Sequence, residues 1–142
     1  MTAEIEGLLP HREPFLFVSE IVEASAEQIT AKHTFTEKDF FFKGHFPEYP
    51  LVPGVILIEA MAQAGGAGLK KIASFDTSSL FFLATIDKAK FRRQVRPGDE
   101  LYSEIKNVRI SSGMIKQKGK AYVGTELAAE AEWMCLVQSA EK

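Results

Sequence analysis

One segment limits the possible folds more than any other part of the sequence. Residues 54–72 read "GVILIEAMAQAGGAGLKKI", with good helix formers as far as Ala64. Pro53 precedes this segment, and Lys70 and Lys71 stand near its end. Because proline suits the mouth of a helix and lysine its C-terminal end, we predict one helix about 28 Å long. Apolar side chains cover nearly its whole circumference, so the rest of the chain is expected to surround it.

Most of the remaining sequence predicts β-strands, after a short helical turn and a proline-rich loop at the N-terminus. The strand patterns lie at residues 15–25, 28–36, 80–87, 88–95, 101–110, 114–123 and 129–137. Residues 125–133 are ambiguous, because alanine and glutamate favour a helix while the apolar positions keep a two-residue period. We predict a strand there, because the neighbouring segments are strands. The result is an α+β fold of about six or seven strands, in which an antiparallel sheet curls around the helix.

Size, charge and cysteine content narrow the class of protein. The 142 residues suit a single domain over positions 1–142. The net charge of −2 argues against a general nucleic-acid-binding protein. Cys135 is the single cysteine, which excludes an internal disulfide and a thiol cluster for a metal; we predict a small buried side chain. Without a leader pattern or a run long enough to span a membrane, the sequence predicts no membrane partner and a cytoplasmic location.

An ionisable carboxylate stands inside the apolar helix segment. An isolated glutamate is charged at neutral pH, but burial among apolar side chains raises its pKa. With Ile58 and Met61 nearby, Glu59 is therefore a candidate for a carboxylic acid that stays protonated until it donates its proton. Gln63 follows one helical turn later, where its amide can orient the carboxyl group. The alternative is a charged residue on a stripe that faces solvent.

His45 lies fourteen positions before Glu59, in front of a loop that holds three prolines between residues 47 and 53. Imidazole titrates near neutral pH, so a ring on a rigid mount suits a general base. A lone histidine is more often a surface residue or a satisfied core residue, and this is our prediction for His11 and His33.

The backbone amide of Gly54 opens the predicted helix. Amides at a helix N-terminus, together with the helix dipole, stabilise a negatively charged oxygen. A base, a neutral acid and such an oxyanion site together fit the elimination of water from a carbonyl compound. The base takes the proton α to the carbonyl, the amide stabilises the enolate-like charge, and the acid protonates the departing hydroxyl group.

Three segments carry a resemblance to a known family. They read "LLPHREPFLFVSEIV", "FFFKGHFPEYPLVPGVILIEAMAQAGG" and "FFLATIDKAKFRRQVRPGDEL". Through nearly its whole length the sequence resembles the 3-hydroxyacyl-acyl-carrier-protein dehydratases of fatty acid biosynthesis, of the FabZ type. The block that combines GHFP, PG and EAMAQ is highly specific for this family. One departure is Glu48, where the family usually has glycine.

The resemblance implies a hotdog fold, in which a curled antiparallel sheet wraps a long central helix. It implies a lyase of the hydro-lyase class that converts (3R)-3-hydroxyacyl-acyl-carrier-protein thioesters to trans-2-enoyl thioesters without a cofactor or metal. The family forms homodimers with shared active sites and commonly assembles as a trimer of dimers.

The resemblance also implies a role for each site residue. His45 would be the base and the partner subunit's Glu59 the acid, with Gln63 as the partner that orients the carboxyl. The amide of Gly54 would bind the thioester carbonyl, with Leu51 as a second amide donor. Related dehydratase-isomerases have aspartate in place of Glu59, so the resemblance favours the simple dehydratase.

Basic residues gather in one stretch of the sequence, which matters because acyl carrier proteins are strongly acidic. They are Lys88, Lys90, Arg92, Arg93 and Arg96. Two-residue alternation places the first three on one face of a strand. We predict that these residues dock the carrier protein. The alternative is a solvated edge strand whose charges prevent aggregation.

Three other functions stay open at this point. A hotdog thioesterase would use the helix carboxylate to activate water at the same thioester, although His45 in its GHFP context argues against this. A non-catalytic carrier-binding subunit would keep the fold without the activity. A third protein class would carry out the same dehydration in a secondary lipid or polyene pathway.

Overall fold

A long helix forms the centre of the molecule. The computed structural model describes residues 2–45 and 48–138, and helix α2 spans Gly54–Lys71. Pro53 precedes it with a φ angle of −57°, as a proline at a helix mouth should, and two lysines occupy its last turn. The predicted helix is therefore confirmed. Of the proline loop at 47–53, the first residue, Pro47, lies outside the described residues.

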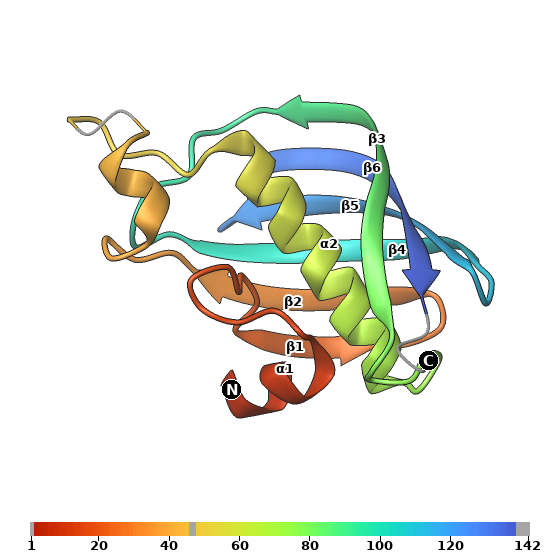
Figure 1. The fold of residues 1–142 in the computed structure, drawn as a ribbon. Coiled ribbons are helices and arrows are strands. Elements are labelled where there is room, and N and C mark those ends of the chain that lie inside the picture. Colours follow the sequence, from red (N-terminus) through yellow and green to blue (C-terminus); the bar gives the residue numbers. More distant parts are fainter. Residues whose placement is uncertain (1, 46–47, 139–142) are drawn as a thin grey trace.

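Antiparallel strands curl around α2 (Figure 1). Within the described residues they are β1 (Glu20–Ala24), β2 (Gln28–Thr34), β3 (Leu80–Phe91), β4 (Glu100–Ile110), β5 (Met114–Val123) and β6 (Glu126–Gln138). They form a six-stranded sheet in the order β1-β2-β4-β5-β6-β3, so β1 and β3 are its two edges. This architecture confirms the predicted α+β fold, and the ambiguous segment at 125–133 belongs to a strand.

Two short helices complete the described structure. Helix α1 (Thr2–Leu8) lies at the C-terminal end of α2, where Lys71 Nζ and Glu4 Oε2 form an ion pair 2.9 Å long. The 3₁₀ helix η1 (Phe40–Lys43) precedes the loop that leads into α2. No helix among the described residues is long and apolar enough to cross a membrane.

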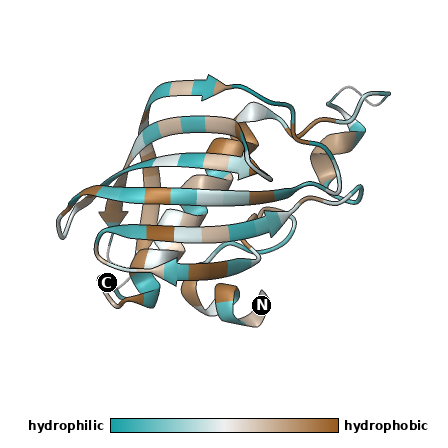
Figure 2. Ribbon diagram, turned by 180° about the vertical axis from the view of Figure 1, so that it is seen from behind, coloured by the Kyte–Doolittle hydropathy of each residue, from teal (hydrophilic) through white to brown (hydrophobic). Residues whose placement is uncertain are grey.

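The core lies between α2 and the inner face of the sheet. Trp133 of β6, Ile115 of β5 and Met61 of α2 are almost fully buried in it. Seen from behind, the strands carry alternating hydrophilic and hydrophobic bands, as expected for a sheet with one face on the core (Figure 2). Gly68 lets α2 sit deep in the sheet, because a Cβ atom there would lie 2.5 Å from the side chain of Ile29.

The prediction of two strands at 80–87 and 88–95 is wrong. Both patterns begin in one strand, β3, which ends at Phe91. Its register against β6 shifts between Asp87 and Lys90, and Lys88 there has a φ angle of 54°. This β-bulge adds a residue and interrupts the two-residue period, so one bent strand reads as two segments in the sequence.

The first strand is shorter than predicted, because β1 begins at Glu20 rather than at residue 15. Two backbone groups in the apolar segment before it bond to a side chain of α2. The carbonyl of Phe15 accepts a hydrogen bond from Gln63, and the amide of Phe17 donates one to the same side chain. This segment therefore packs on the helix as a loop.

Candidate active site

His45 and the start of α2 line one cavity of about 530 Å³. Its lining is mainly apolar and includes Gly54 and Phe91, with Arg92 and Arg93 contributing positive charge. The cavity thus combines an imidazole, a helix N-terminus and cationic side chains.

The imidazole of His45 is held by a backbone group. Its Nδ1 atom lies 3.0 Å from the carbonyl oxygen of Leu51. A carbonyl oxygen only accepts hydrogen bonds, so in the neutral ring Nδ1 carries the proton and Nε2 carries the lone pair. This tautomer is the one that a general base requires. The contact uses the carbonyl of Leu51, and a role for its amide stays a prediction.

The N-terminus of α2 presents backbone amides at the same cavity. The amides of Ile56 and Leu57 both donate to the carbonyl of Pro53, at 2.9 and 3.3 Å. The amides of Gly54 and Val55 therefore precede the hydrogen-bonded ladder of the helix, where N–H groups have no intrahelical acceptor. Such groups, at the positive end of the helix dipole, suit a negatively charged oxygen.

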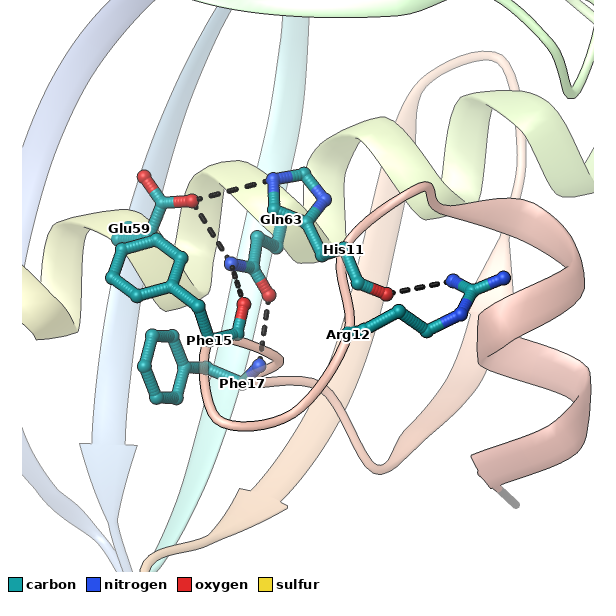
Figure 3. A network of polar contacts seen from close by, with 6 residues as sticks. All are labelled: His11, Arg12, Phe15, Phe17, Glu59 and Gln63. Carbon is teal, nitrogen blue, oxygen red and sulfur yellow. Dashed lines mark hydrogen bonds and ion pairs between the residues drawn. The ribbon is translucent and has the colours of Figure 1, made fainter. Parts of the chain in front are cut away.

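Glu59 lies further along α2, in a network of polar contacts (Figure 3). The Nε2 atom of Gln63 donates to Glu59 Oε2 at 2.9 Å and to the carbonyl of Phe15 at 3.1 Å. The Oε1 atom of Gln63 accepts from the amide of Phe17 at 2.8 Å. Because the amide of Phe17 can only donate, the side-chain amide of Gln63 has one possible orientation, and it acts on Glu59 only as a donor.

Burial raises the pKa of the Glu59 carboxyl above its ordinary value, while the hydrogen bond from Gln63 acts in the opposite direction. The side chain is 22% exposed, which argues against a charged residue on a stripe that faces solvent. Cys135 is buried, as predicted, and burial with the nearby Glu59 raises its pKa to about 11.

His11 faces the carboxyl of Glu59 from the loop after α1 (Figure 3). Its Nε2 atom lies 3.6 Å from Glu59 Oε2. Burial, followed by the positive charges of Lys70 and Arg12, lowers the pKa of His11, so the ring is neutral at neutral pH. The sequence patterns predict no contact between this residue and Glu59. The available signal was its position between two prolines in the first of the segments that resemble the family.

The predicted site residues fall into two groups in one chain. Leu51, Gly54 and His45 line the cavity at the mouth of α2. Glu59 and Gln63 are not among the described residues that line this cavity. Gln63 bonds to the loop before β1 instead, and Glu59 contacts Gln63 and His11. Among the described residues, His, Cys, Asp and Glu side chains form no group of three that could hold a metal ion.

Four of the five predicted docking residues line two different cavities. Lys88 and Lys90 line a groove of about 430 Å³ that also includes residues of β4, β5 and β6, whereas Arg92 and Arg93 line the cavity of His45. The prediction of three residues on one strand face is wrong for Arg92, because β3 ends before it. Contacts within the chain hold Lys88 near Glu132 (3.8 Å), Arg92 near Glu130 (2.6 Å), Arg93 near Glu126 (3.0 Å) and Arg96 over the Tyr49 ring (4.3 Å).

Comparison with known proteins identifies the family. The model of the FabA-like domain matches residues 9–132. A protein of Pelotomaculum thermopropionicum is 44% identical over 137 residues, which are 95% of this chain and 96% of the relative. A protein of Variovorax paradoxus is 44% identical over 140 residues, 95% of this chain and 92% of the relative. Both are named 3-hydroxyacyl-[acyl-carrier-protein] dehydratase FabZ.

The chain belongs to the FabZ-type dehydratases.

Solved structures show that this FabZ-type chain has the hotdog fold. The dehydratase heterocomplex ApeI:P from Xenorhabdus doucetiae matches with a TM-score of 0.80 and 16% identity, over 95% of this chain and 91% of that one. A hypothetical thioesterase with coenzyme A from Streptococcus pneumoniae matches with a TM-score of 0.62 and 10% identity, over 87% and 88%. At these identities the likeness concerns the fold alone.

Proposed function

We propose that the protein dehydrates 3-hydroxyacyl-acyl-carrier-protein thioesters in fatty acid biosynthesis, with His45 as the base and Glu59 as the acid. The substrate class follows the names of the curated relatives. The assignment of the two residues rests on their complementary protonation. The contact with Leu51 leaves the lone pair on Nε2 of His45, and burial favours the protonated carboxyl of Glu59.

The reaction breaks two bonds and forms a double bond. Nε2 of His45 takes the proton on Cα, and the electrons of that C–H bond become the Cα–Cβ double bond. The thioester oxygen gains negative charge, which the amide of Gly54 stabilises. Glu59 transfers its proton to the hydroxyl group on Cβ, and the C–O bond breaks to release water. After the reaction His45 holds one additional proton and Glu59 has lost one. Transfer of one proton from His45 to Glu59 through solvent therefore restores the enzyme.

A neutral carboxyl group is essential to this reaction. Hydroxide is a poor leaving group, so the hydroxyl must receive a proton as the C–O bond breaks. A carboxyl ionised at working pH has no proton to give. The burial of Glu59 is therefore the property that suits this helix to the chemistry.

We propose that two copies of the chain form each site, with His45 of one copy opposite Glu59 of the other. The two residues lie in separate surroundings within one chain. The edge strand β3 exposes large apolar side chains, with Phe82 49%, Ile86 44% and Phe91 51% exposed. An edge with unpaired backbone groups and apolar side chains favours pairing with another strand. A trimer of dimers stays a prediction.

Mixed dimers test the shared site. His45→Ala and Glu59→Gln each lose most of the turnover as separate proteins, because a proton-transfer group contributes about 10²- to 10⁴-fold. Co-expression produces mixed dimers with one site free of substitutions, so random mixing should restore about a quarter of wild-type activity. Activity no higher than in the separate variants would show that the two residues do not act across subunits.

The product identifies the reaction. We expect incubation with a 3-hydroxyacyl carrier thioester to raise the enoyl absorbance without releasing a free thiol. Thiol release would indicate a thioesterase, and neither signal would indicate a non-catalytic subunit. The same assay, run on chains of different length, defines the preferred substrate.

We propose that the basic residues on β3 and in the loop after it dock the carrier protein. Arg92 and Arg93 support this because they line the cavity of His45, where an acyl group would enter. Added salt should raise KM for the carrier-bound substrate but not for a short thioester analogue. Lys88→Glu with Lys90→Glu, two residues that line the other groove and not the cavity of His45, should reproduce this difference at low salt. Equal effects on both substrates would contradict docking.

Several expectations from the sequence stay predictions. They are one domain over residues 1–142, a reaction without a cofactor, the absence of nucleic-acid and membrane partners, and a cytoplasmic location.

A further inference from the structure

The two oxygen atoms of the Glu59 carboxyl have different surroundings. Oε2 accepts the hydrogen bond from Gln63 at 2.9 Å, and His11 Nε2 lies 3.6 Å from the same atom. Figure 3 shows the two side chains approaching this oxygen from separate elements, Gln63 from α2 and His11 from the loop after α1. An oxygen that accepts from donors is a poor position for the acidic proton. The proton of the neutral acid is therefore placed on Oε1.

The tautomer of His11 follows from its surroundings. Its Nδ1 atom is buried and has no hydrogen-bond partner among the described residues. A buried N–H without an acceptor costs more than a buried lone pair without a donor, because unpaired donors are rarely tolerated. The proton is therefore on Nε2, which points at Glu59 (Figure 3). The opposite tautomer would also set a lone pair against the oxygen of Glu59.

The groups around His11 keep its ring neutral. Lys70 on α2 and Arg12 on its own loop are both positive and oppose protonation. Glu6 on α1 lies 4.0 Å from Arg12, and Glu59 itself is the acidic group that His11 contacts. A charged imidazolium beside Glu59 would ionise the carboxyl and remove the proton that the dehydration needs. A neutral donor orients the carboxyl without this loss.

We propose that His11 is a positioning residue, which donates from Nε2 to Oε2 of Glu59 and so leaves Oε1 as the oxygen that delivers the proton. This rests on the proposed function, in which Glu59 is the acid. The separation of 3.6 Å is longer than a formed hydrogen bond, and contacts of catalytic groups commonly tighten during turnover. As the proton leaves Oε1, the donation to Oε2 strengthens, because the carboxyl becomes an anion.

Two substitutions separate donation from packing. His11→Leu removes the N–H group and fills a similar volume. His11→Gln keeps an N–H donor near the position of Nε2. The thermal midpoints of both variants, measured at one protein concentration, report any loss of packing. Where His11→Leu does not fold, His11→Asn takes its place, because its shorter side chain cannot bring an N–H group to Oε2.

The first measurement is a titration of Glu59 by NMR, with glutamate labelled at the carboxyl carbon and the signal assigned by its loss in Glu59→Gln. His11→Leu should raise the pKa of Glu59 above that of the wild type, because the carboxylate loses a donor. His11→Gln should keep the wild-type titration. An unchanged or lowered pKa in His11→Leu would overturn the proposal.

The second measurement is the pH dependence of turnover. His11→Leu should lower kcat about tenfold with little change in KM, the effect of one lost hydrogen bond, and should move the alkaline limb of kcat to higher pH. His11→Gln should recover most of kcat. Equal losses in both variants, with an unmoved alkaline limb, would mean that His11 only packs the loop. If the wild type forms no enoyl product, the proposed function fails, while the NMR titration still decides the contact between His11 and Glu59.

Discussion

Replacing Gln63 by leucine should damage both the fold and the acid. The side chain is 3% exposed and connects three groups, the carboxyl of Glu59, the carbonyl of Phe15 and the amide of Phe17. Leucine has a similar volume but no polar atoms. Gln63→Leu therefore leaves two backbone groups of the loop before β1 without their partner.

The expected loss of stability follows from these contacts. A buried polar group that loses its partner costs about 1 to 3 kcal/mol, so the two backbone groups together cost about 2 to 6 kcal/mol. This is a large fraction of the free energy of unfolding of a typical domain, about 5 to 15 kcal/mol. The hydrogen bond from Gln63 also lowers the pKa of Glu59, against the larger effect of burial. Its removal should therefore raise that pKa and move the alkaline limb of kcat to higher pH.

Gln117 offers a matched control. This glutamine is 1% exposed and bonds to the carbonyl of Gly65 at 3.3 Å, to Asn107 at 2.8 Å and to the indole N–H of Trp133 at 3.1 Å. Gln117→Leu should destabilise the protein comparably and leave the alkaline limb of kcat unchanged. Urea unfolding at a fixed protein concentration measures the first effect, and a pH series of enoyl formation measures the second. A Gln63→Leu variant as stable as the wild type, or one with the same alkaline limb, would refute the reasoning.

Two further predictions concern stability. Burial lowers the pKa of His33 from 6.5 to about 4, so only the unfolded chain binds a proton in this window and stability rises with pH. As the pH falls from 6.5 to 4, the wild type should lose about 3 kcal/mol more than His33→Phe in urea unfolding; parallel pH dependences would contradict this. Gly68→Ala should cost about 1 to 3 kcal/mol, because its Cβ would lie 2.5 Å from buried Ile29. Gly7→Ala is the control, since a Cβ there meets nothing within 4 Å, and equal midpoints for the two variants would show that α2 can shift.

The central helix and most strands could be predicted from the sequence because their signals are local. α2 combines an apolar circumference with a proline before it and lysines at its end. β5 begins and ends where its pattern does, at Met114 and Val123, because a sheet with one buried face requires alternating side chains. His45 and Glu59 could be identified for the same reason, because a histidine before a proline-rich loop and a glutamate inside an apolar helix segment are local features of the sequence.

The remaining features depend on contacts between segments far apart in the sequence. The bulge at Lys88 follows from pairing between β3 and β6, and no local pattern indicates it. The loop before β1 is apolar enough for a strand, but its backbone bonds to Gln63. The contact between His11 and Glu59 joins residues 48 positions apart, and only the packing of the N-terminal loop on α2 brings them together. The sequence by itself thus determined which groups have reactive chemistry, whereas the tertiary structure decided which of them meet, because proximity depends on packing.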